Sequence, residues 1–204
     1  MFVAGRTLTA KSGRMADALS LTGAVMSMLN EKYGTNYSIR VDIGGNPNAI
    51  FLVTPFETLA DYEQMRMSYM ADQEINSMLV GSESIADIVE DRLGEIIKPM
   101  GEFDAFAAVN TVRVETPKQM EATAFCLEVA ELATSITGDE VGLIRPLTGD
   151  ISELFFVSNF ASMEDLNQSN AKLTENEDWL ALYEKSIGLI VPGSLHYAIR
   201  QKVA

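Results

Sequence analysis

The stretch Phe51-Leu52-Val53-Thr54-Pro55-Phe56 recurs 104 residues later as Phe155-Phe156-Val157-Ser158-Asn159-Phe160. Both copies combine aromatic and β-branched residues, which is typical of a half-buried β-strand. The same displacement, without a gap, brings further residues of the first half onto similar residues of the second half. The chain of 204 residues is therefore predicted to contain one structural unit twice, over residues 1–101 and residues 102–204.

Each unit is predicted to begin with a strand and a long helix. Residues 2–10 alternate in polarity, and residues 14–33 carry apolar side chains at steps of three and four. Gly34 follows where a left-handed helix end is expected, because glycine adopts a positive φ without a Cβ clash. Residues 37–43 and 49–54 then predict a β-hairpin. The second copy repeats this order.

A second helix is predicted to follow in each unit. In the first copy it opens with Thr58-Leu59-Ala60-Asp61, which resembles a capping box because an acidic residue stands three positions after the cap. The helix is predicted to break near Asp72 and to resume beyond it. Residues 84–93 then predict an additional helix with a solvated acidic face, and residues 94–99 a last strand. In the second copy the last strand is predicted at residues 195–202.

Two segments carry a resemblance to a known fold family. Lys11-Ser12-Gly13-Arg14 is similar to the turn that follows the first strand in the dimeric α+β barrel superfamily. Residues 155–160 and 177–181 resemble that superfamily's third strand and its acidic-aromatic segment. The resemblance implies an α+β fold of two tandem ferredoxin-like βαββαβ units, whose antiparallel sheets form a dimeric-α+β-barrel-type body. Because members dimerise to close a barrel, a duplicated chain either closes one internally or forms a homodimer.

The functional branches that the resemblance implies are antibiotic-biosynthesis-type monooxygenases, which include haem-degrading enzymes, and NIPSNAP-type proteins. The haem-degrading branch has a catalytic asparagine on its first strand, and Asn110 stands at this place. Tyr183 stands where that branch has its histidine. Trp179 aligns with the aromatic residue before that histidine and not with the branch's catalytic tryptophan. Haem degradation is therefore not the reaction that the sequence favours.

Six residues are candidates for a site, which is expected in the second copy's half. His196 is the only histidine, and it stands beside Tyr197 on a terminal strand. Arg6 and Asn110 occupy equivalent positions of the two copies, and the alternation leaves open which face of the sheet they take. The alternatives to a role in the site are that His196 is only solvated and that Trp179 serves packing. The predicted catalytic residues are Asn110 and His196, and the predicted substrate-binding residues are Arg6, Trp179, Tyr183 and Tyr197.

Two tyrosines on the first copy's second helix have a simpler explanation than catalysis. Tyr62 and Tyr69 lie two helical turns apart, and phenol groups can orient a substrate hydroxyl. Leu166 and Leu173 take their places in the second copy, so packing is expected to account for both tyrosines.

The composition argues against several kinds of function. A formal charge of −14 disfavours nucleic acids and anionic membranes as partners, because phosphate binding needs clustered lysine and arginine. No stretch approaches the roughly 18 apolar residues of a membrane span, so a cytoplasmic protein is expected. The single cysteine, Cys126, excludes an intramolecular disulfide and is interpreted as a core thiol. No phosphate-binding loop or metal motif is present, so neither a metal nor another cofactor is expected.

The leading hypothesis is a protein that binds a small, largely apolar organic molecule, with the resemblance implying a cofactor-independent monooxygenase. In such an enzyme an electron-rich phenol or quinol is deprotonated and reacts directly with oxygen. Asn110, Arg6 or His196 would stabilise the developing negative charge. Two alternatives stay open, namely a non-catalytic NIPSNAP-like or regulatory protein, and haem binding with His196 as the axial ligand.

Overall fold

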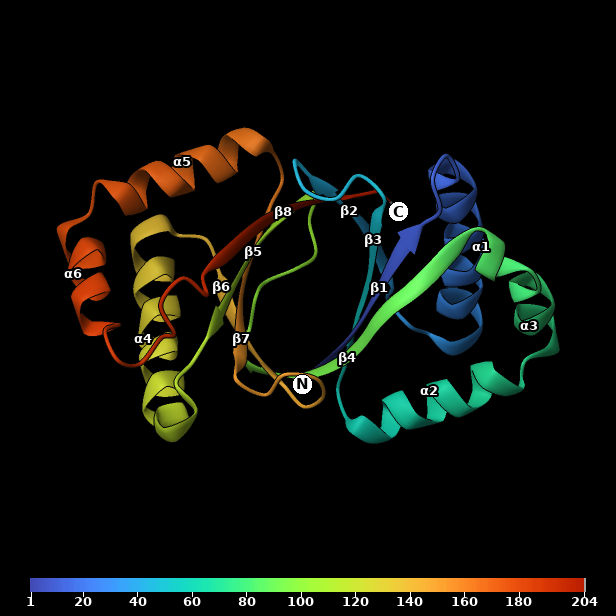
Figure 1. Ribbon diagram of the computed structural model, residues 1–204, viewed down its shortest axis with the longest axis horizontal. Coiled ribbons are helices and arrows are strands. Elements are labelled where there is room, and N and C mark those ends of the chain that lie inside the picture. The colour runs from blue at the N-terminus through green and yellow to red at the C-terminus, as the bar shows by residue number, and fades with distance from the viewer. Residues whose placement is uncertain (204) are drawn as a thin grey trace. The chain divides into compact units, whose positions relative to one another are not determined.

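The computed structural model describes residues 1–203, apart from the side chain of Tyr183. It consists of two compact units, one of residues 1–94 with the chain end from Lys202, and the other of residues 95–201. The chain passes from one unit to the other inside a strand, between Gly94 and Glu95. Each unit has the predicted βαββαβ order (Figure 1), so the predicted α+β fold of two ferredoxin-like units is confirmed.

The first unit contains four strands and three α-helices among its described residues. Their bounds are β1 Phe2–Ala10, α1 Met15–Tyr33, β2 Ser38–Ile43, β3 Ala49–Phe56, α2 Leu59–Ala71, α3 Gln73–Leu79 and β4 Ala86–Lys98. β3 pairs antiparallel with both β1 and β2, and β4 follows β1 in the strand order. The helices lie on one face of this sheet (Figure 1), which leaves the other face without helices of its own unit.

The second unit repeats this topology. Its elements are β5 Phe106–Arg113, α4 Gln119–Thr137, β6 Val141–Pro146, β7 Glu153–Phe160, α5 Met163–Thr174, α6 Glu177–Lys185 and β8 His196–Lys202. β7 pairs with β5 and β6, and β8 pairs with the other edge of β5. Strand for strand, the order is the same as in the first unit. Short 3₁₀ turns at Ser82–Ser84 and Thr116–Lys118 complete the two units.

The predicted helix ends are confirmed by the backbone. Gly34 and Gly138 end the first helix of each unit with φ values of 64° and 84°, in the left-handed region that glycine favours. Thr58 and Asp61 form a complete capping box at the start of α2. The predicted break at Asp72 separates α2 from α3.

The prediction of a helix at residues 84–93 is wrong, because β4 runs from Ala86 to Lys98. Its acidic residues stand at helix-like intervals, but Ile88 and Val89 favour a strand, and β1 lies beside this segment. Pairing with a neighbouring strand therefore overrides the local pattern.

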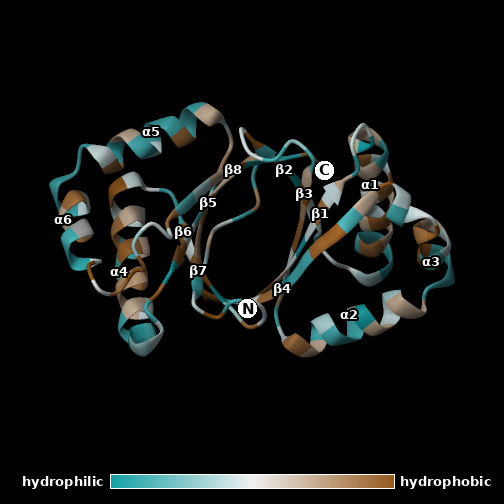
Figure 2. Ribbon diagram, viewed as in Figure 1, coloured by the Kyte–Doolittle hydropathy of each residue, from teal (hydrophilic) through white to brown (hydrophobic). Residues whose placement is uncertain are grey.

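Each unit builds its main core between its sheet and its first helix. In the first unit Ile39, Ile50 and Leu52 of the sheet pack with Val25 and Leu29 of α1. The outer helices α2 and α5 alternate between hydrophilic and hydrophobic residues along their length (Figure 2), as expected for helices that cover a sheet on one side. No helix in residues 1–203 has both the length and the apolar character that crossing a membrane requires.

Candidate functional site

The structure decides which face of the sheet Arg6 takes. On β1, Ala4 packs against Met65 of α2, and Leu8 packs against the core that α1 covers. Side chains alternate between the two faces along a strand, so residues 4, 6 and 8 share one face. Arg6 therefore also points toward the helices. The first unit therefore has a cation between its sheet and its helical layer.

Arg6 is held by a carboxylate on the neighbouring strand. Its Nε donates a hydrogen bond to Oδ1 of Asp91 over 2.5 Å, and its Nη2 donates to Oδ2 over 2.7 Å. This two-bond geometry fixes the plane of the guanidinium. The hydrogen bonds to Asp91 raise the pKa of Arg6 further above its ordinary value, against the effect of burial. Because 32% of the Arg6 side chain is still exposed, solvent reaches the pair.

Tyr37 and Tyr69 lie close to this ion pair, and Tyr62 packs against the same apolar cluster as these two residues. Tyr37, Tyr62 and Tyr69 are all partly buried and pack against one small apolar cluster on the helix side of the sheet. The phenol of Tyr69 is near enough to Arg6 to contribute to the raised pKa of the guanidinium. Burial raises the pKa of Tyr37, and the charge of Arg6 only partly opposes this effect. Tyr37 is therefore a neutral hydrogen-bond donor at any physiological pH.

The tyrosine rings are held by the geometry of α2. Tyr62 meets Phe56 of β3 edge to face, with ring centroids 5.3 Å apart. Seven residues further along α2, Tyr69 stands two turns on and near the end of the helix. Both rings therefore face the sheet from one helix, with Met65 buried between them in the sequence.

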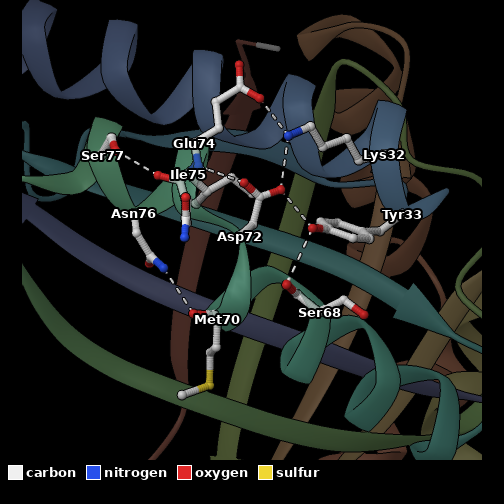
Figure 3. Close-up of polar contacts among 10 residues, drawn as sticks. Lys32, Tyr33, Ser68, Met70, Asp72, Glu74, Ile75, Asn76 and Ser77 are labelled. Carbon is white, nitrogen blue, oxygen red and sulfur yellow. Dashed lines mark hydrogen bonds and ion pairs between the residues drawn. The ribbon is translucent and has the colours of Figure 1, made fainter.

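The far end of α2 is fixed by the network drawn in Figure 3. Oδ1 of Asp72 accepts hydrogen bonds from the backbone N–H groups of Glu74 and Ile75, which caps α3. Its Oδ2 accepts from Lys32 Nζ over 3.0 Å and from the Tyr33 hydroxyl over 2.8 Å. The Lys32 and Tyr33 hydrogen bonds lower the pKa of Asp72 to about 2. Asp72 thereby ties the junction of α2 and α3 to the end of α1.

In the second unit the structure separates the two predicted catalytic residues. On β5, Asn110 stands opposite Tyr197 of β8, so these two side chains share the helix side of the sheet. His196 stands opposite Thr111, so its side chain projects from the face away from the helices, where it is exposed. The structure therefore brings Asn110 together with Tyr197 and not with His196.

The other predicted residues of the second unit lie in its helical layer. Trp179 is partly buried and packs against the core between α4 and the sheet, as does Phe156, which stands opposite Asn110. Tyr183 belongs to α6, but its side chain lies outside the described part of the structure. Packing accounts for the position of Trp179.

Sequence reasoning missed the partners of Arg6 in the first unit. Asp91 is not found from the sequence, because the acidic spacing of its segment indicates a solvated helix although the segment is a strand. For Tyr62 and Tyr69 the sequence favours packing alone. The signal that could have found them is their polarity, because the second copy has leucine at both equivalent positions. Among residues 1–203, no three histidine, cysteine, aspartate or glutamate side chains converge as metal ligands.

Comparison with known proteins gives a fold and no sequence family. No protein-family model and no curated protein matches the sequence. A "putative monooxygenase" of Fusobacterium nucleatum is 11% identical, with a TM-score of 0.69 over 100% of this chain and 92% of that protein. An "anthrone oxidase-like protein" is also 11% identical, with a TM-score of 0.65 over 100% and 92% of the two chains. A regulator of staphylococcal pathogenesis matches over the full length of both chains at 11% identity and a TM-score of 0.57.

These matches define the class of fold. Two ferredoxin-like units in one chain, similar over their whole length to such proteins, constitute the fold of the dimeric α+β barrel superfamily. The predicted resemblance is therefore confirmed at the level of the fold. Proteins with this fold include both a monooxygenase-like and a regulatory member, so the activity has to be argued from the site.

Proposed function

We propose that the protein is an oxygenase for electron-rich aromatic substrates, and that the substrate binds beside Arg6 on the helix side of the first unit's sheet. The observation that carries the proposal is a fixed guanidinium, paired with Asp91 and close to Tyr37 and Tyr69, within reach of solvent. The likeness of the fold to a "putative monooxygenase" and an "anthrone oxidase-like protein" supports the choice of reaction.

The reaction begins with removal of a proton from the substrate. Asp91 is the carboxyl group in contact with Arg6, and it would accept the proton of a phenol or enol hydroxyl. Before transfer Arg6 is paired with the Asp91 carboxylate, and after transfer it is paired with the substrate oxyanion. The guanidinium therefore keeps one anionic partner throughout, so little charge has to be solvated anew in the transition state.

The remaining chemistry belongs to the electron-rich anion. For an anthrone-type substrate, the carbanionic carbon binds molecular oxygen, and the resulting hydroperoxide loses water. One oxygen atom then becomes the new carbonyl, while the other leaves as water with both hydrogens of the original methylene group. The tyrosines would act as hydrogen-bond donors and as aromatic surfaces for the ring, because Tyr37 stays protonated.

The test is oxygen consumption by the purified protein with anthrone, quinols and polyphenols. Arg6→Leu is expected to lower kcat/KM by about 100-fold, since it removes charge stabilisation from the transition state. Asp91→Asn is expected to have a similar effect and to change the pH profile, because it removes the proposed base. Tyr37→Phe keeps the ring and removes only one donor, so it is expected to cost about tenfold.

Matched variants in the second unit distinguish the two candidate locations. Asn110→Ala and His196→Ala are expected to leave turnover within about twofold if the site lies beside Arg6. Loss of turnover in these variants, with Arg6→Leu unaffected, would move the site to the second unit. Binding without oxygen consumption across the whole panel would favour a non-catalytic ligand-binding protein.

A further inference from the structure

A second polar group, the hydroxyl of Thr54, lies on the same sheet face as Arg6. Thr54 of β3 is completely buried, with 0% of its surface exposed. Within the described residues, no hydrogen-bond partner lies within reach of its hydroxyl oxygen. A buried hydroxyl without a partner opposes folding, so native structures retain very few of them. Its presence calls for a partner that is not part of this chain.

The strand register places this hydroxyl beside the candidate site. Thr54 stands opposite Ala4, and Leu52 stands opposite Arg6. Thr54 is therefore the diagonal neighbour of Arg6 on the helix-covered face, at a Cβ separation of roughly 7 Å. Met65 of α2 packs against Ala4 and so lies over this part of the sheet. Because a methionine side chain is unbranched and adaptable, a ligand can displace it and reach the hydroxyl.

We infer that Thr54 is a specificity-determining residue that hydrogen-bonds a second oxygen of an aromatic ligand whose first oxygen lies at Arg6. The inference rests on the proposed binding site, and it narrows the preferred ligand to an aromatic ring with two oxygen substituents, which favours quinols over anthrone among the proposed substrates. A threonine hydroxyl both donates and accepts, so it serves a phenol as well as a carbonyl. A quinol and a quinone can therefore both be bound through this contact.

The chain offers a matched control on the other face of the same sheet. Ser38 of β2 is 2% exposed, and within the described residues its hydroxyl also has no hydrogen-bond partner. It stands opposite Val53, and therefore faces away from the helices and from Thr54. Removing this hydroxyl tests what an unpaired buried hydroxyl does when it is remote from the candidate site.

The experiment measures binding of 1,4-dihydroxynaphthalene and 1-naphthol by calorimetry under argon, with thermal unfolding of the ligand-free proteins. Thr54→Val keeps the shape and removes the hydroxyl. It is expected to weaken binding of the dihydroxy probe at least about tenfold and to leave 1-naphthol within about twofold. Thr54→Ser should retain the preference, and Ser38→Ala should leave both affinities unchanged. Without ligand, Thr54→Val should unfold at the same or a higher temperature than the wild type.

Each other outcome has a definite meaning. An unchanged affinity of Thr54→Val for the dihydroxy probe overturns the inference, as does equal binding of both probes by the wild type. A clear fall in the melting temperature of Thr54→Val, absent in Thr54→Ser, assigns the hydroxyl to the fold and also overturns it. Selective binding without oxygen consumption leaves the subsite standing while the oxygenase proposal fails. Binding of neither probe by the wild type overturns both proposals.

Discussion

The centres of the two sheets have the same backbone and opposite chemistry. Arg6 on β1 and Asn110 on β5 occupy equivalent places, opposite Leu52 and Phe156 respectively, and both face the helices. Around Arg6 the first unit gathers charged and phenolic groups. At the equivalent positions of Asp91, Tyr37, Tyr62 and Tyr69 the second unit has Leu195, Val141, Leu166 and Leu173.

This contrast teaches which positions of the repeated unit are free to diverge. Gly34 and Gly138 both end a helix in the left-handed conformation, and Asp61 and Asp165 both follow a capping residue. These residues satisfy backbone requirements that every copy of the unit shares. Polar groups in the helix-covered centre satisfy no such requirement. The first unit places an ion pair and tyrosines there, whereas the second unit has the uncharged residues Asn110 and Tyr197, and this is why the candidate site is assigned to the first unit.

The largest expected effect comes from copying one residue of the first unit into the second. Gly142 of β6 corresponds to Ser38 of β2. A Cβ at Gly142 would lie 2.3 Å from Met100 Cβ and 2.7 Å from its Cα, so the backbone has to move. Gly142→Ser is expected to lower the free energy of unfolding by about 3 kcal/mol, measured by urea denaturation. The reverse change, Ser38→Gly, should cost only about 1 kcal/mol. If Gly142→Ser lowers the free energy of unfolding by less than about 1 kcal/mol, the contact between residue 142 and Met100 is not tight.

A smaller effect is expected at the helix junctions, where Asp72 corresponds to Asn176. Both residues cap the next helix, but only Asp72 also binds Lys32. Its pKa is lowered from 3.8 to about 2, so its carboxylate contributes stability above pH 4 that is lost as the pH falls toward 2. Asp72→Asn should therefore lower the melting temperature at pH 7 and flatten its fall between pH 4 and pH 2.

The control for this junction is Lys32→Met, which removes the cation and keeps the cap. It should also flatten the acid limb of the melting temperature, because the hydrogen bond from Lys32 is the largest cause of the lowered pKa. If the melting temperatures of both variants fall between pH 4 and pH 2 as steeply as that of the wild type, Asp72 is not the cause of this fall.

The last comparison is measured as a labelling rate and concerns the buried pair Thr22 and Cys126, which are equivalent residues on α1 and α4. Burial raises the pKa of the Cys126 thiol to about 12, so hardly any thiolate exists at pH 8. Modification by an aromatic disulfide reagent at pH 8 should be on the order of a thousandfold slower in the folded protein than in urea. Thr22→Cys should protect its thiol similarly. Rapid labelling of native Cys126 would show that its helix opens readily.

The sequence predicted the order of the elements well because their signals are local. Apolar periodicity predicted α1 and α4, and Gly34 was recognised as a helix end from the need for a positive φ. The prediction from sequence failed at residues 84–93, where the spacing of acidic residues indicated a helix but the segment forms a strand. The contact between Arg6 and Asp91 could not be predicted for the same reason, because Asp91 lies in that segment and is 85 residues from Arg6 in the sequence.

By itself, the sequence determined the repeated unit, its helix caps and the equivalence of Arg6 with Asn110. Only the tertiary structure decided that both residues point toward the helices and that His196 lies on the opposite face of the sheet from Asn110. It also decided that Asp91 pairs with Arg6. The physical reason is that alternation along a strand defines two faces without saying which one the helices cover. That choice depends on packing between segments that are distant in the chain.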